Sequence, residues 1–215
     1  MPIVVLNADE GSFDLMVAHR LEPEIYNFRS LAFFSKAVER VGEESYPIHI
    51  KLDTGMHRLG FMEGELDMLT ETLGETPSVK VATIFSHLNC SDMPQEDRYT
   101  REQIARFDRM SGRLAAALPY PVLRHTANSA AIERFPEAQF DMCRLGLGLY
   151  GFGFEHNDEL KPVSTLKSRI VQLKHLSAGE AVGYGRAGKL TRDSVTATVP
   201  MGYADGLDRH LGCGR

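Results

Sequence analysis

Residues 49–61 read HIKLDTGMHRLGF, a strand that runs into a turn rich in polar groups. In a parallel α/β sheet, functional side chains gather at the carboxyl ends of the strands, which is where residues 53–58 would lie. A carboxylate at this point can also cap the next helix, so a solvated turn with Asp53 as the cap is an equal alternative. The stretch therefore predicts a parallel βα unit with a candidate site at the end of its strand.

Similar β-rich runs recur at intervals of about 20 to 40 residues, with helical patterns between them. The six predicted strands are residues 3–6, 24–28, 48–53, 79–87, 122–125 and 142–150. Between the second and third runs, Ser30 is placed to cap a helix and Gly42 to end it. A closed (β/α)8 barrel has about 250 residues. The predicted fold class is therefore α/β, an incomplete TIM-type barrel of six βα units.

The pattern changes after Gly151. Residues 194–201 alternate between apolar and polar side chains, which is typical of a half-buried antiparallel strand. Residues 153–162 carry charged and amide side chains and form the predicted linker. We therefore expect a partial barrel over residues 1–152 and the start of an all-β domain over residues 153–215.

Composition limits the classes of partner. The chain has 215 residues, 43% of them hydrophobic, and a formal net charge of -5, which disfavours nucleic acid or an acidic membrane surface as the main partner. The three cysteines are odd in number and lack CxxC spacing, as expected for reduced thiols. The sequence shows no signal-peptide order and no apolar run near the roughly 18 residues of a membrane span. A cytoplasmic protein with a small-molecule partner is expected.

Polar groups also concentrate at three other predicted strand ends, in the segments SHLN (86–89), HTANS (125–129) and RLG (144–146). A single histidine or arginine in such a place is more often structural than catalytic. Four such strand ends at one edge of the sheet favour a ligand-binding site, because burying polar groups without partners is costly in free energy. The pattern predicts a ligand with both anionic and polar atoms.

Gly146, Gly148 and Gly151 spell GxGxxG, the fingerprint of dinucleotide-binding sites. Here the motif lies inside an apolar run and no acidic residue follows at the required distance, so that interpretation is rejected. Backbone amides near Gly146 and Leu147 suit a phosphate instead, with the Ser129 hydroxyl beside them. The histidines form no HxH or HxxxH pair and no GxSxG occurs, which argues against a metal site and a serine hydrolase.

Two tyrosines are flanked by glycines, Tyr184 in VGYG (182–185) and Tyr203 in VPMGYADG (199–206). Tyrosines in hairpin turns explain this pattern equally simply. The flanking glycines also allow the backbone to approach a ligand closely.

Together with KLDTGMHRLG (51–60), HTANSAA (125–131) and RLGLGLYG (144–151), these motifs resemble alanine racemases of the fold-type III pyridoxal-phosphate enzymes. The resemblance implies that the cofactor is pyridoxal 5′-phosphate and that the reaction interconverts L- and D-alanine, supplying D-alanine for peptidoglycan. It also implies a homodimer in which each active site lies between one barrel and the partner's β domain.

The resemblance assigns roles residue by residue. Arg58 would contact the phenolic oxygen of the cofactor, and Lys51, by analogy a carbamylated lysine, would orient Arg58. His87 would pack against the pyridine ring and Arg144 would face its nitrogen. Tyr184 would be one catalytic base and would act in the active site of the partner subunit. The family's arrangement around this tyrosine is a hydrogen-bond path through His87 to Arg144.

The remaining implied residues surround the phosphate and the substrate. The cofactor-binding residues near the phosphate are Asn128, Ser129, Gly146 and Leu147. Tyr203 would line the entrance for the substrate.

The sequence departs from the family in one important respect. The family's Schiff-base lysine lies in a segment resembling VKANAYGHG, and no such segment occurs here. We expect an internal portion of a racemase, inactive by itself, with Tyr184 as one of two bases and the lysine missing. The alternatives are a relative that binds the cofactor without turnover, or the racemase half of a fusion with a muramoyl-tripeptide ligase.

Overall fold

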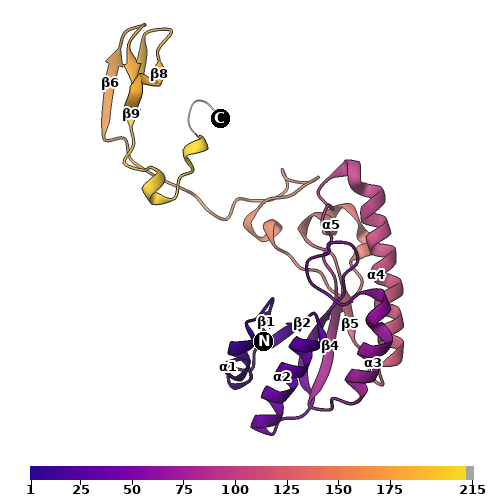
Figure 1. The fold of residues 1–215 in the computed structure, drawn as a ribbon. Helices are drawn as coiled ribbons and strands as arrows, with labels where there is room; N and C mark the ends of the chain where they lie inside the picture. Colours follow the sequence, from indigo (N-terminus) through magenta and orange to yellow (C-terminus); the bar gives the residue numbers. More distant parts are fainter. Residues whose placement is uncertain (212–215) are drawn as a thin grey trace. The chain divides into compact units, whose positions relative to one another are not determined.

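A five-stranded parallel sheet organises the first part of the chain (Figure 1). The computed structural model describes residues 1–211, which fall into two units, Met1–Val163 and a second one from Ser164 onward. The strands of the sheet are β1 (Val4–Val5), β2 (Glu22–Ile25), β3 (Tyr46–Lys51), β4 (Val79–Phe85) and β5 (Leu123–His125). They follow one another in chain order and every neighbouring pair is parallel, which confirms the predicted α/β class.

Helices α1 to α4 connect successive strands and lie alongside the sheet, and α5 follows β5 (Figure 1). They are α1 (Phe13–Ala18), α2 (Phe28–Val41), α3 (Leu66–Gly74), α4 (Asp97–Ala117) and α5 (Ser129–Arg134). Helix α2 begins earlier than predicted because Asn27, and not Ser30, is its cap: the Asn27 carboxamide oxygen accepts the Ser30 N–H at 2.7 Å. Gly42 ends the helix as predicted, in the left-handed conformation with φ of 74°.

The two faces of the sheet differ in chemistry, because successive side chains of a strand point to opposite faces. One face carries apolar side chains such as Ile25, Ile50 and Val81, which form the main core together with α1–α4. The other face carries buried polar side chains. These are Glu24, His49, Lys51, Thr83 and His125, with Glu22 half-buried beside them. The candidate site is built on this polar face.

The predicted sixth strand, residues 142–150, is wrong. This segment contains no strand, and Leu147–Tyr150 form a 3-10 turn. The backbone N–H groups of Gly146 and Gly148 donate to the Ser129 hydroxyl oxygen at 2.8 and 3.2 Å, so they are not free to join a strand ladder. Within the described residues the sheet therefore has five strands and is not closed.

The second unit contains two antiparallel pairs, as expected for a β domain. Strand β6 (Gln172–Leu176) pairs with β9 (Ser194–Thr198), and β7 (Ala181–Val182) pairs with β8 (Gly188–Lys189). Strand β9 is the alternating run predicted from the sequence. It ends just before Val199 and Pro200, and proline has no N–H for a ladder.

The remaining regular segments are single 3-10 turns at Glu10–Ser12, Glu63–Glu65, Pro94–Glu96, Pro136–Ala138, Tyr184–Arg186, Tyr203–Asp205 and Arg209–Leu211. None of the helices formed by residues 1–211 is both long and apolar enough to cross a bilayer. Cys90 and Cys143 are free thiols, whereas Cys213 lies outside the described residues.

Candidate active site

A cavity of about 490 Å³ lies at the carboxyl ends of β4 and β5. Six of the residues predicted from the sequence line it. They are His87, Asn128, Ser129, Arg144, Gly146 and Leu147. His87 follows β4, Asn128 caps helix α5 and Ser129 begins it. Arg144 and Gly146 precede the Leu147–Tyr150 turn and Leu147 begins it, so segments up to 60 residues apart in the chain meet at one place.

Arg144 is the most extensively bonded side chain of this site. Its Nη2 donates to the carbonyl oxygens of Ser86 at 2.6 Å and Thr126 at 3.2 Å, and its Nη1 lies 2.6 Å from His125 Nδ1. The guanidinium also lies 5.3 Å from the ring centre of Phe85. Burial lowers the pKa of Arg144 to about 10, so the group remains a cation at neutral pH.

A chain of hydrogen bonds continues from Arg144 across the polar face. Because His125 Nδ1 accepts from Arg144, its Nε2 carries the hydrogen and donates to Thr83 Oγ1 at 3.0 Å. The Thr83 hydroxyl then donates to His49 Nδ1 at 2.8 Å, and His49 Nε2 donates to Glu22 Oε2 at 2.7 Å. Burial, followed by the charges of Arg144 and His49, lowers the pKa of His125 to about 3. Both imidazoles are thus held in one tautomer, and His125 is neutral at physiological pH.

His87 lies on the cavity wall, with its Nδ1 3.5 Å from Arg144 Nη2. Burial, followed by the positive charges of Arg144, Lys51 and Arg58 in that order of importance, lowers the pKa of His87 to about 4. The ring is therefore a neutral imidazole that can accept a hydrogen bond from the guanidinium.

The Ser129 hydroxyl lies against the glycine turn. The Ser129 Oγ accepts two backbone N–H groups and keeps its own hydrogen for a further acceptor. A Cβ at position 148 would lie 2.7 Å from Leu145 Cδ1, the end of an exposed side chain that has room to move aside. The Asn128 carboxamide caps helix α5 through the Ala131 N–H and also accepts from the Ser91 hydroxyl, so Asn128 shapes the wall.

The turn after β3 is organised by Asp53, whose Oδ1 accepts the N–H groups of Gly55 and His57 at 2.9 and 3.0 Å. A Cβ at Gly60 would lie 2.6 Å from the Asp53 backbone nitrogen, so only glycine fits there. Asp53 therefore organises this turn from a buried position, and it does not cap the next helix as the alternative predicted, because α3 begins at Leu66 with Glu65 as its cap. Arg58 is exposed in the same turn, whereas Lys51 is buried in an ion pair with Glu24.

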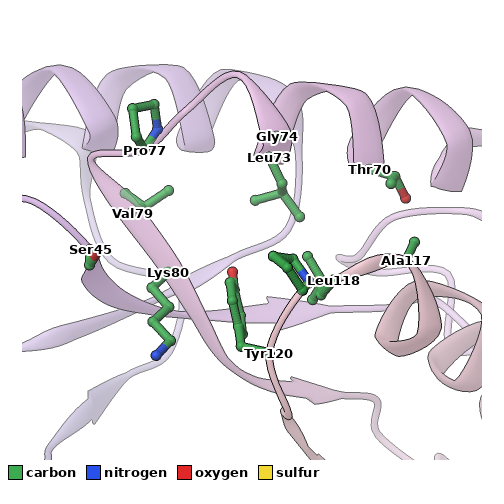
Figure 2. A pocket seen from close by; sticks show the side chains of 11 residues that line it. Ser45, Thr70, Leu73, Gly74, Pro77, Val79, Lys80, Ala117, Leu118 and Tyr120 are labelled. Carbon is green, nitrogen blue, oxygen red and sulfur yellow. The ribbon is translucent and has the colours of Figure 1, made fainter.

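A second cavity, of about 330 Å³, lies near the amino ends of β3 and β4 (Figure 2). Lys80 and Tyr120 lie beside each other there, with the Lys80 ammonium 4.9 Å from the ring centre, and the Tyr120 hydroxyl accepts the Val81 N–H at 3.2 Å. The Lys80 ammonium and the Tyr120 hydroxyl thus already have partners within the protein. The cavity contains none of the predicted site residues.

Tyr184 and Tyr203 belong to the second unit, which is described by itself. Both lie in 3-10 turns and are exposed within that unit. The turn of Tyr184 joins the paired strands β7 and β8 and is the hairpin turn of the alternative, whereas that of Tyr203 follows β9 and joins no strand pair among residues 1–211. Gly183 and Gly185 on either side of Tyr184 have φ of 84° and 65°, conformations that glycine adopts readily.

Family comparisons agree with this geometry. A model of the alanine racemase N-terminal domain matches residues 1–153, and a model of the alanine racemase C-terminal domain matches residues 163–215. The chain belongs to the alanine racemase family. The resemblance seen in the motifs is thereby confirmed.

Individual alanine racemases are similar over nearly the whole chain. The enzyme of Sorangium cellulosum is 36% identical over 98% of this chain and 57% of its own length. That of Clostridium novyi is 35% identical over 98% of this chain and 56% of its own length. The solved alanine racemase of Streptomyces coelicolor A3(2) superposes with a TM-score of 0.88 at 28% identity, over 98% of this chain and 57% of that one. The chain thus spans somewhat more than half the length of these alanine racemases.

The alanine racemase of Bartonella henselae has covalently bound pyridoxal phosphate in its crystal structure. It is 26% identical, with a TM-score of 0.79 over 98% of this chain and 58% of that one. The cavity described above fits the same cofactor, because its volume is that of a small-molecule site and it combines amides, a hydroxyl and a guanidinium. The cofactor predicted from the sequence agrees with this chemistry.

Four polar residues of the site were missed from the sequence: Glu22, Glu24, His49 and Thr83. The available signal was their period of two, since Glu22 and Glu24 alternate with apolar residues on β2, and His49 and Lys51 do so on β3. Polar residues on one face of predicted parallel strands indicate a shared buried network.

Proposed function

We propose that this chain carries the larger part of the site of a pyridoxal-phosphate-dependent alanine racemase, which interconverts L- and D-alanine. The observation that supports this most strongly is the convergence of His87, Arg144 and the Ser129 turn on one cavity, in a chain of the alanine racemase family. The cavity would take the cofactor, and alanine would bind against it.

Different side chains would bind different parts of the cofactor. Ser129, Gly146 and Leu147 would hold the phosphate, while Arg144 would face the pyridine nitrogen and His87 would pack beside the ring; all five line the cavity. Arg58 would contact the phenolic oxygen from the turn after β3. When bound, pyridoxal phosphate supplies the electron sink that allows the α-proton of alanine to leave.

The positive charge of Arg144 would determine how strongly the cofactor ring withdraws electrons. With a pKa of about 10, the guanidinium donates a hydrogen bond and keeps its proton, so a ring nitrogen facing it stays unprotonated. A weaker sink restrains side reactions such as transamination. The hydrogen-bond chain from Arg144 through His125 to Glu22 keeps the guanidinium in place.

Racemisation needs a proton acceptor and donor on each face of the α-carbon. Tyr184 is the proposed base on one face, and the other base is a lysine that is not among these 215 residues. We propose that Tyr184 reaches the site of a second copy in a homodimer, that Tyr203 lines the substrate entrance, and that the protein supplies D-alanine for peptidoglycan in the cytoplasm.

The test follows both reactions of alanine in D₂O with the purified full-length protein and pyridoxal phosphate. We expect conversion of D- to L-alanine by the unsubstituted protein. In Tyr184→Phe, racemisation falls about 100-fold, because a catalytic base contributes at least this much, while α-hydrogen exchange is retained in one enantiomer only.

Tyr120→Phe is the matched control, since Tyr120 lines the second cavity and loses a hydroxyl in the same way. Its racemisation rate should be unchanged. No conversion of D-alanine by the unsubstituted protein would refute the proposed function, and equal losses in both variants would refute the role of Tyr184.

A further inference from the structure

Lys51 and Glu24 form a buried ion pair on the polar face of the sheet. Lys51 Nζ lies 2.7 Å from Glu24 Oε1, and the two side chains are 8% and 1% exposed. Glu24 Oε2 accepts the Asn7 N–H at 2.6 Å, and Oε1 has no partner besides Lys51 within the described part of the chain. Each carboxylate oxygen is thus committed to one donor.

The negative charge of Glu24 acts on more than one positively charged side chain of this site. Lys51, Arg58 and Arg144 all lower the pKa of His87, so three positive charges surround that ring. The negative charge of Glu24 acts on Arg144 in the opposite direction to burial, which lowers the pKa of Arg144.

The other nearby carboxylates are engaged elsewhere. Glu22 accepts from His49, and Asp53 accepts the amides of its own turn.

We propose that Glu24 is a positioning residue that holds Lys51 as an unmodified ammonium, so that a carboxylate of the chain supplies the negative charge that a carbamate on Lys51 would otherwise supply. This inference deepens the proposed function. Only the importance of the ion pair for catalysis rests on the proposed function.

The chemistry of carbamylation explains why the pair prevents it. The lone pair of a neutral Nζ attacks the carbon of CO₂, and an N–C bond forms as one C=O π bond breaks and its electron pair moves to oxygen. One proton then leaves Nζ to solvent, so that a carbamate anion replaces an amine. An ammonium in an ion pair has no lone pair to attack with. The product would also place a second anion against the buried Glu24 carboxylate, and like charges at contact in a buried site are strongly unfavourable.

The pair fixes the position of Lys51 as well. Its Nζ lies 5.7 Å from the ring centre of Phe85, the same ring that Arg144 contacts on the neighbouring strand end. The ammonium held by Glu24 and the guanidinium of Arg144 thus both lie beside the Phe85 ring.

The test is carbon-13 NMR of the purified protein in ¹³C-labelled bicarbonate at mildly alkaline pH, without pyridoxal phosphate. We expect no carbamate resonance from the unsubstituted protein. In Glu24→Gln, the charge is lost in a side chain of equal size, and a carbamate resonance appears that is absent from the double variant with Lys51→Arg. The matched control is Glu22→Gln, which removes the neighbouring carboxylate of β2 and should give no resonance.

A carbamate resonance from the unsubstituted protein would overturn the proposal, as would its absence from folded Glu24→Gln or its presence in Glu22→Gln. If Glu24→Gln does not fold, electron density at Lys51 in crystals of the unsubstituted protein grown with bicarbonate decides: a bare Nζ supports the proposal and a planar three-atom extension contradicts it. Neither readout involves racemisation, so failure of the alanine assay would refute the proposed function and leave this inference standing.

Discussion

Replacing Arg144 with glutamine, R144Q, should lower alanine racemisation by roughly 1,000-fold, the upper range for removal of one preorganised donor group. The variant should also lose about 3 kcal/mol of unfolding free energy, because buried acceptors left without donors cost about 1–3 kcal/mol each. Glutamine is shorter and has one amide group, so it cannot replace the bonds to Ser86, Thr126 and His125 together. Steady-state kinetics and urea unfolding measure the two effects.

Arg98→Gln is the control for loss of a guanidinium. Arg98 is 93% exposed and pairs with Glu102 one helical turn away, so the change should cost less than about 1 kcal/mol and leave the rate unchanged. An R144Q protein with the stability and activity of Arg98→Gln would mean that Arg144 does not organise the site.

Acidification from pH 7 to pH 5 should destabilise the first unit by about 2 kcal/mol. In the folded protein, burial holds the pKa of His125 at about 3 and that of His87 at about 4, both below the ordinary value of 6.5. As the pH falls below 6.5, these histidines bind protons in the unfolded chain but not in the folded one. The free energy of unfolding therefore decreases until the pH reaches their pKa values in the folded protein. The simple linkage sum for two such groups is about 4 kcal/mol, which we halve to account for partial solvent screening.

Urea unfolding followed by circular dichroism at several pH values tests this. Most carboxylates stay ionised above pH 5, so the buried histidines dominate the slope in this window; His49, whose pKa burial also lowers, contributes in the same direction. His19→Gln, which changes an exposed histidine, should leave the slope unchanged. A stability that is flat between pH 7 and pH 5 would show that neither imidazole is held neutral.

The sequence predicted the parallel βα order and the strand-end residues because both depend on local patterns. Gly42 ended its helix as expected, and part of the run at 194–201 became strand β9, since positive φ and a period-two sequence pattern are local properties. The predicted burial of its apolar side chains is wrong within this unit, because Val195 is 58% exposed. The sixth strand failed for a non-local reason: the Ser129 hydroxyl, about 17 residues upstream, takes the amides of Gly146 and Gly148.

The partners of buried charges were also beyond local patterns. Lys51 was expected to orient Arg58, whereas the structure pairs it with Glu24 across the β2–β3 register, in which Glu24 lies opposite His49. Register between strands decides such pairs, and a single sequence does not specify it. The phenol groups of Tyr184 and Tyr203 remain predictions as site residues, because they belong to the second unit.

The central claim is that the Ser129 turn, His87 and Arg144 bind the phosphorylated cofactor together. The most direct measurement is isothermal titration of the protein with pyridoxal 5′-phosphate and with pyridoxal, for the unsubstituted chain and for Ser129→Ala. We predict that the unsubstituted chain prefers the phosphorylated form at least about 10-fold, the worth of a single charge-assisted hydrogen bond, and that the preference shrinks in Ser129→Ala. Equal affinity for both compounds, or a preference that Ser129→Ala leaves intact, would contradict the account.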